Sequence, residues 1–137
     1  MKVREIMTTN VECLSPDAGV TELANKMKTL DVGFIAVCEN DRLVGTVTDR
    51  DIVIRCIAAG KNISACMARD IMSKDIFWCY DDQDVKEVVR QMSEKEVRRM
   101  LILNKDKRLV GVVSIGDIAK VEEKESGKAL KNITDAA

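Results

Sequence analysis

The sequence predicts an α/β fold made of two similar units, each with the order strand, helix, strand, strand, helix. Three observations predict it. The chain repeats itself at an offset of about 65 residues, each copy carries an apolar stripe with helical spacing, and each stripe is followed by two short apolar runs around a polar turn. The chain has 137 residues, of which 46% are hydrophobic and 33% charged, enough to bury the core of one such two-unit domain.

The repeat is carried by identical residues at matched positions. Ile6-Met7 matches Ile71-Met72, and 42–45 matches 108–111 once one extra residue, Lys107, is allowed in copy two. The remaining identities pair Asp17, Val20, Glu22, Met27, Val32, Asp41, Val47, Asp51 and Ile52 with Asp82, Val85, Glu87, Met92, Val97, Asp106, Val113, Asp117 and Ile118. These 15 identities over 47 aligned positions, with one gap in an expected turn, indicate an internal duplication.

The first elements of each copy are a short strand and a helix. The strands are expected near 11–14 and 76–79. In copy one, Ser15-Pro16-Asp17 supplies a cap, a first-turn proline and an acidic first turn, so a helix is expected to begin there. In copy two, the matching helix is expected to follow Asp82 and Asp84. The expected buried stripes consist of Val20, Leu23, Ala24, Met27 and Leu30, and of Val85, Val88, Val89 and Met92.

A hairpin and a final helix complete each copy. The apolar runs 34–38 and 43–47, and 100–103 and 109–113, are each joined by a polar turn, as in a hairpin. The final helices are expected to begin near Asp49 and Ile115.

These elements predict a domain organisation. We expect a first motif over 1–57, a connector over 58–70, a second motif over 71–120 and a polar tail over 121–137. A unit of about 50 residues is marginal alone, so the two are expected to share a core.

Composition argues against several functions. With 22 basic and 23 acidic side chains the net charge is −1, which gives no general attraction to nucleic acid or acidic membranes. No apolar run approaches the roughly 18 residues of a membrane span, and no signal-peptide region follows the first residues, so we expect a cytoplasmic protein. The chain has no histidine, no Walker-type loop and no acidic metal cluster, so we expect no enzymatic activity and no bound metal.

The five cysteines are Cys13, Cys38, Cys56, Cys66 and Cys79. Their number is odd, no pair has CxxC spacing, and three lie inside apolar segments. This pattern favours buried, reduced thiols over disulfides or a redox site.

Two matched pairs of polar residues mark the starts of the final helices: Thr48 with Asp51, and Ser114 with Asp117. A hydroxyl at a helix start lies beside backbone N–H groups that favour a phosphate, and an ionised aspartate one turn later can accept the hydroxyls of a ribose. The same Ser/Thr-x-x-Asp pattern is also a capping box, in which the two side chains satisfy backbone donors. Both interpretations stay open from the sequence.

Further candidates surround these pairs. Gly45 and Gly111 remove a side chain where a ligand or another backbone must approach closely. Copy one, with Arg50 next to Thr48, is better equipped for a phosphate than copy two, with Gly116. Arginines that could bind a phosphate are Arg50, Arg98 and Arg99, and apolar walls for an adenine are Val11, Ile35, Ile76 and Met100.

Both copies resemble CBS motifs over about residues 3 to 120. The most specific stretches are 43–52 and 109–118, where a glycine, two apolar or small residues, a Ser or Thr, two variable residues and an Asp follow one another. The opening Met-Thr or Met-Ser and Val97-Arg98-Arg99 are also similar to the family. The chain departs from it at Ala36 and Leu101, where a proline is common, which puts the shape of the adenine-side pocket in doubt.

The resemblance implies two motifs packed about a pseudo-twofold axis, with clefts that bind AMP, ADP, ATP or S-adenosylmethionine, and a disc-shaped homodimer. No cofactor would be required. We therefore expect a stand-alone regulatory module that senses an adenosine-containing ligand and signals to a partner protein. The alternative is a structural or protein-interaction dimer module with no bound nucleotide.

Overall fold

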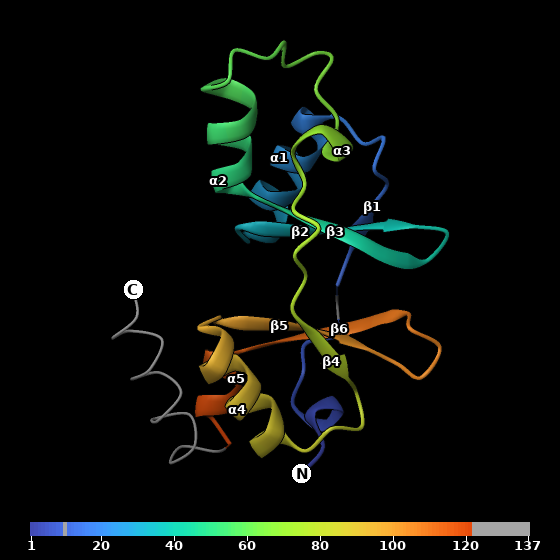
Figure 1. Cartoon of the computed structure of the whole chain (residues 1–137), viewed down its shortest axis with the longest axis vertical. Coiled ribbons are helices and arrows are strands. Elements are labelled where there is room, and N and C mark those ends of the chain that lie inside the picture. The colour runs from blue at the N-terminus through green and yellow to red at the C-terminus, as the bar shows by residue number, and fades with distance from the viewer. Residues whose placement is uncertain (10, 122–137) are drawn as a thin grey trace. The chain divides into compact units, whose positions relative to one another are not determined.

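The computed structural model describes residues 1–9 and 11–121 and divides the chain into two compact units (Figure 1). Unit 2 is the continuous segment Glu12–Ile76. Unit 1 combines Met1–Val11 with the chain from Phe77 onward, so in Figure 1 the blue N-terminal segment belongs with the yellow and orange elements. The motif boundaries predicted from the repeat and the boundaries of these compact units therefore differ.

Unit 2 contains a three-stranded sheet in the order β1-β2-β3. Strand β1 is parallel to β2, and β2 is antiparallel to β3. Helix α2 continues directly into the π-helix η2, which makes one helix of these two elements. The elements are β1 (Cys13–Leu14), α1 (Val20–Leu30), β2 (Phe34–Glu39), β3 (Arg42–Thr48), α2 (Asp49–Asp51), η2 (Ile52–Ile57) and α3 (Ala68–Ile71).

Unit 1 repeats this arrangement with the sheet order β4-β5-β6. Again the first pair of strands is parallel and the second antiparallel. The predicted α/β class and the two strand-helix-strand-strand-helix units are confirmed. The elements are η1 (Val3–Glu5), β4 (Trp78–Tyr80), α4 (Val85–Lys95), β5 (Arg99–Leu103), β6 (Leu109–Ser114) and α5 (Ile115–Ala119).

The predicted start of α1 is wrong. Ser15 forms a separate turn, in which its Oγ accepts the N–H of Asp17 at 3.1 Å and its carbonyl accepts the N–H of Ala18 at 2.9 Å. The helix begins later, at Val20, with Gly19 as the N-cap. In unit 1 the prediction is confirmed, because Asp84 caps α4 and its Oδ1 accepts the N–H of Lys86 at 2.9 Å.

The duplication extends to the backbone of the turns. The C-cap residues of α1 and α4, Asp31 and Glu96, both adopt the left-handed conformation, with φ of 54° and 57°. Each hairpin turn also contains a left-handed residue, Asp41 in the first with φ of 64° and the extra residue Lys107 in the second with φ of 61°. Asn40, at φ 53°, gives the first hairpin two consecutive left-handed residues, the backbone that a two-residue turn requires.

The buried side chains form two clusters, one in each unit, whereas the sequence predicted a single shared core. The predicted stripes supply much of both, although Ala24 is exposed. The unit 2 cluster contains Val20, Leu23, Met27, Ile35, Val37, Val47, Cys56, Cys66, Ala68 and Ile71. The unit 1 cluster contains Val3, Cys79, Val85, Val88, Val89, Met92, Met100, Ile102, Val113, Ile115 and Ile118.

Each unit is completed by the segment that opens the other copy of the repeat. In unit 1, Thr8 extends along the edge of β6 and exchanges two backbone hydrogen bonds with Val112, at 2.9 and 3.0 Å. In unit 2, Ser73 exchanges two with Thr46 of β3, at 2.9 and 3.0 Å. The Met-Thr and Met-Ser steps that open the two copies therefore each add one β-bridge to the edge of a sheet.

The prediction that all five cysteines are reduced is wrong for two of them, because Cys13 and Cys38 form a disulfide. The register pairs Cys13 with Ala36, which places Cys38 two residues further along β2 on the same face of the sheet. Such diagonal neighbours lie close enough for a bond, and the two Cα atoms are 5.6 Å apart. Cys56, Cys66 and Cys79 are buried thiols, as predicted.

None of the helices among the described residues is long and apolar enough to cross a lipid bilayer.

Candidate functional site

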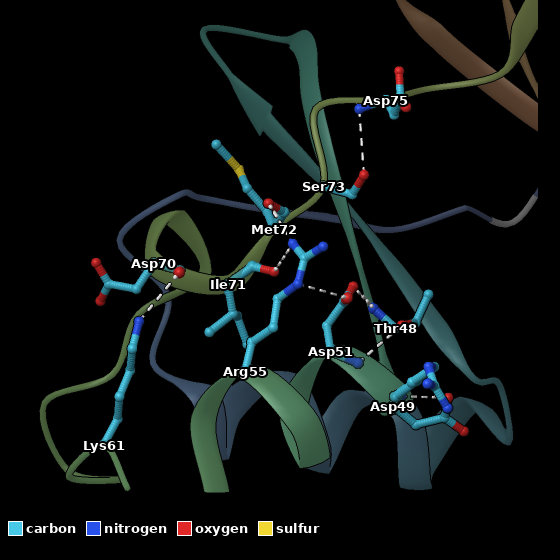
Figure 2. A network of polar contacts seen from close by, with 11 residues as sticks. Thr48, Asp49, Asp51, Arg55, Lys61, Asp70, Ile71, Met72, Ser73 and Asp75 are labelled. Atoms are coloured by element: carbon cyan, nitrogen blue, oxygen red, sulfur yellow. Dashed lines mark hydrogen bonds and ion pairs between the residues drawn. The ribbon is translucent and has the colours of Figure 1, made fainter. Parts of the chain in front are cut away.

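The candidate pair of unit 2 lies where β3 leads into α2. Figure 2 shows the reciprocal bonds: the Thr48 Oγ1 accepts the backbone N–H of Asp51 at 3.1 Å, and the Asp51 Oδ2 accepts the backbone N–H of Thr48 at 2.9 Å. Both side chains are half-buried. A further bond, from the N–H of Asp49 to the carbonyl of Gly33 at 2.9 Å, ties the helix start to β2.

Unit 1 repeats the arrangement where β6 leads into α5. The Ser114 Oγ accepts the N–H of Asp117 at 3.2 Å, and the Asp117 Oδ2 accepts the N–H of Ser114 at 3.0 Å. The N–H of Ile115 donates to the carbonyl of Arg98 at 3.0 Å. The capping interpretation is thus confirmed in both copies. Ligand binding at the same residues stays a prediction. It is compatible with capping, because the caps use only the Oδ2 atom of each carboxylate.

The two glycines of the repeated motif are explained by the close approach of another backbone, one of the two alternatives left open by the sequence. A Cβ on Gly45 would lie 2.8 Å from the Met72 sulfur and 2.9 Å from the Ser73 carbonyl oxygen. A Cβ on Gly111 would lie 2.5 Å from the Met7 sulfur and 2.9 Å from the Thr8 carbonyl oxygen. Both glycines make room for the edge segments that complete the sheets.

Arg55, which the sequence reasoning missed, connects the unit 2 pair to the end of α3. Its Nε lies 3.7 Å from the Asp51 Oδ1, and its Nη1 donates to the carbonyls of Ile71 at 3.3 Å and Met72 at 3.5 Å (Figure 2). The available signal was the spacing, because residues four apart on a helix are neighbours and an Asp followed by an Arg at that distance favours an ion pair.

The arginines proposed for phosphate binding lie in different places. Arg99 is the cross-strand partner of Ser114, the residue that caps α5 together with Asp117. In unit 2 the partner of Thr48 is Phe34. Arg50 is exposed between the two aspartates of α2, and its backbone N–H donates to the Asp49 Oδ1 at 2.8 Å. Arg98 is exposed beside Arg99.

The four residues proposed as adenine walls divide into two kinds. Ile35 and Met100 are only 2% and 1% exposed, and their side chains pack inside the core of unit 2 and unit 1. Val11 and Ile76 are half-buried. Val11 is the last residue of the N-terminal segment of unit 1, and Ile76 is the last residue of unit 2.

The buried thiols are poor nucleophiles. Burial raises the pKa of Cys79 to about 12. Burial, together with contact with Cys56, raises the pKa of Cys66 to about 11. Both groups therefore stay protonated at neutral pH, and only a thiolate reacts or binds a metal. In the described part of the chain, no three His, Cys, Asp or Glu side chains come together in a way that could hold a metal ion.

The profile of the CBS domain matches residues 3–57 and 68–124. Among curated proteins, the uncharacterized protein MK0525 of Methanopyrus kandleri is 35% identical over 123 residues, 89% of this chain; the chain spans 63% of that protein's length. Hypoxic response protein 1 of Mycobacterium tuberculosis is 35% identical over 118 residues, 85% of this chain and 82% of the relative.

Solved structures share the fold. The crystal structure of hypoxic response protein I with two coordinated zinc ions has a TM-score of 0.79 at 34% identity, covering 88% of this chain and 98% of that one. The CBS domain pair of protein MJ0100, in complex with 5′-methylthioadenosine and S-adenosyl-L-methionine, has a TM-score of 0.74 at 20% identity, covering 91% and 98%.

Proposed function

Because this chain belongs to the CBS domain family and carries the motif twice, we propose that it is a non-catalytic regulatory module that binds an adenosine-containing ligand and signals to a partner protein. The observation that carries the proposal is the matched pair of hydroxyl and carboxylate, Thr48 with Asp51 and Ser114 with Asp117, built identically at the end of the third strand of both units.

Each pair offers the groups that a ribonucleotide needs. The caps use the Oδ2 atoms of Asp51 and Asp117, so the Oδ1 atoms are the acceptors proposed for ribose hydroxyls. The hydroxyls of Thr48 and Ser114 are proposed to contact phosphate. We assign phosphate charge to Arg50 in unit 2 and Arg99 in unit 1, and apolar contacts with adenine to the half-buried Val11 and Ile76. Ile35 and Met100 are left out of the proposed contacts, because their side chains pack inside the two cores.

The ligand class is supported by the chemistry bound to the MJ0100 domain pair, in which both molecules contain adenosine. The candidates are AMP, ADP, ATP and S-adenosylmethionine. No cofactor is required by the proposal, because sensing needs only a difference in affinity between two states of the protein.

Thermal unfolding with each of the four ligands tests the proposal. A ligand that binds only the folded chain stabilises it by about 2.7 kcal/mol at one hundred times its dissociation constant, which raises Tm by several degrees. The double variant Asp51→Asn, Asp117→Asn should lose the shift, whereas the matched control Asp106→Asn, in an exposed turn of unit 1, should keep it. No shift with any of the four at millimolar concentration would contradict the proposal.

A second candidate function, a dimer module for protein interaction with no nucleotide, is favoured by one observation. Three apolar side chains of η2 are exposed, Val53 by 52%, Ile54 by 48% and Ile57 by 55%. Such a surface on one helix fits a second copy of this chain. Sedimentation analysis of wild type against Val53→Ser, Ile57→Ser measures it: a monomeric wild type contradicts this function, and a dimer that the double variant dissociates supports it.

A further inference from the structure

The two candidate carboxylates differ in what holds their second oxygen. Both Asp51 and Asp117 give Oδ2 to the cap. The Oδ1 of Asp51 faces the guanidinium of Arg55 at 3.7 Å. Among residues 1–9 and 11–121, Asp117 makes no ion pair and bonds only to Ser114. Within the described part of the chain, the acceptor proposed for ribose is therefore already engaged by an arginine in unit 2 and has no such partner in unit 1.

Arg55 is held by more than this ion pair. Its Nη1 also donates to the carbonyls of Ile71 and Met72, at 3.3 and 3.5 Å (Figure 2). These carbonyls are fixed in turn, since the next residue, Ser73, is bonded to β3 at Thr46. These two bonds hold the guanidinium beside the Asp51 carboxylate, so a ligand that takes the Oδ1 has to compete with Arg55 for it.

The second copy has no counterpart of Arg55. With the same offset that aligns Asp51 with Asp117, the matched residue is Val121, which is apolar and exposed. The residues opposite the two hydroxyls on the neighbouring strand also differ. Ser114 lies opposite the cationic Arg99, whereas Thr48 lies opposite the uncharged Phe34. Both differences favour unit 1 for a ligand that combines a ribose with negative charge.

We propose that Arg55 is a specificity-determining residue that makes the two sites unequal. The Asp117 site binds an anionic ribonucleotide first, and the Asp51 site binds it more weakly because Arg55 competes for the carboxylate. This inference rests on the proposed function, and it reverses the ranking that the sequence suggested from Arg50.

Isothermal titration of the full chain with AMP tests this. Wild type should show a tighter and a weaker phase. Asp117→Asn should weaken the tighter phase by about tenfold or more, because a hydrogen bond to a charged acceptor is replaced by one to a neutral amide. Asp51→Asn should leave that phase within about twofold. Arg55→Met should tighten the weaker phase by about twofold or more, the scale of an exposed ion pair four residues apart.

Controls separate ligand selection from stability. Arg90→Met removes another arginine that is paired with carboxylates three and four residues away, on α4, and should leave both phases unchanged. The Tm of each variant without AMP should not follow the change in affinity, whereas a merely structural role of Arg55 would lower Tm and leave both affinities unchanged.

The outcomes distinguish two failures. Two equal phases in wild type, a tighter phase that depends on Asp51, or a weaker phase unmoved by Arg55→Met overturn this inference and leave the proposed function standing. Absence of heat with AMP, together with no thermal shift with any of the four ligands, overturns the proposed function and this inference with it.

Discussion

Replacing Gly111 by alanine tests whether the N-terminal segment completes the sheet of unit 1. The new Cβ would lie 2.5 Å from the Met7 sulfur, 2.9 Å from the Met7 Cγ and 2.9 Å from the Thr8 carbonyl oxygen. The thioether can rotate away, but the carbonyl belongs to a backbone that is bonded to Val112 on both sides. The Thr8 segment therefore has to move away from β6.

The cost follows from three contributions. Overpacking of this kind costs about 1–3 kcal/mol, and the displacement strains or breaks two hydrogen bonds worth roughly 1 kcal/mol each. Alanine recovers about 0.4–1 kcal/mol by restricting the unfolded chain. We expect Gly111→Ala to lower the free energy of unfolding by about 3 kcal/mol.

Urea unfolding at unchanged m-value measures the loss. Gly116→Ala is the matched control, because its Cβ would meet only the Ser114 Oγ, at an ordinary 3.6 Å, and should leave stability equal or higher. In the double variant Met7→Ala, Gly111→Ala the sulfur clash disappears and the carbonyl clash remains, so the two costs should be less than additive. A Gly111→Ala protein within about 0.5 kcal/mol of wild type, with the Thr8 amide still protected from exchange, would refute the reasoning.

Three further predictions concern single features. Serine at Cys13 and Cys38 should lower the free energy of unfolding by about 3.5 kcal/mol, from the chain entropy of a loop that spans 25 residues, and reducing agent should then have no further effect on urea unfolding. Thr48→Ala and Ser114→Ala should each cost about 1 kcal/mol through loss of a cap, measured by thermal unfolding. Cys79 should resist alkylation at pH 8 in the folded chain. Its pKa of about 12 in the folded chain exceeds the ordinary value of 9.0. Between these values the folded state keeps a proton that the unfolded state loses, so the free energy of unfolding should fall as the pH rises from about 9 towards 12. Urea unfolding at several pH values measures this.

The sequence was sufficient for features that depend on local pattern. Apolar spacing located α4, both hairpins and the starts of α2 and α5, because helical and strand periodicities are read over a few neighbouring residues. The start of α1 was misplaced because a Ser-Pro-Asp turn and a helix N-terminus share the same residue types; only the bonds of Ser15 distinguish them.

Features that depend on pairing between distant segments were missed. The Cys13–Cys38 disulfide follows from the register between β1 and β2, and a one-residue slip would have put the two side chains on opposite faces. The bonds of Arg55 to Ile71 and Met72 depend on where the chain packs after the stretch 58–67 between η2 and α3. No local sequence pattern specifies that position.

The repeated motif can now be divided by what each residue contacts. Gly45 and Gly111 contact the Met-Ser and Met-Thr segments that begin the opposite copies, so each half of the repeat contributes to the sheet edge of the other half's unit. This exchange explains why the glycine and the opening methionine occur together twice, and it requires no ligand. The hydroxyl and the carboxylate are accounted for in part, since the caps use one carboxylate oxygen and leave the other. The Oδ1 atoms of Asp51 and Asp117 are therefore the acceptors that capping does not use, and variants at these two residues and at Arg55 test whether a ligand binds them.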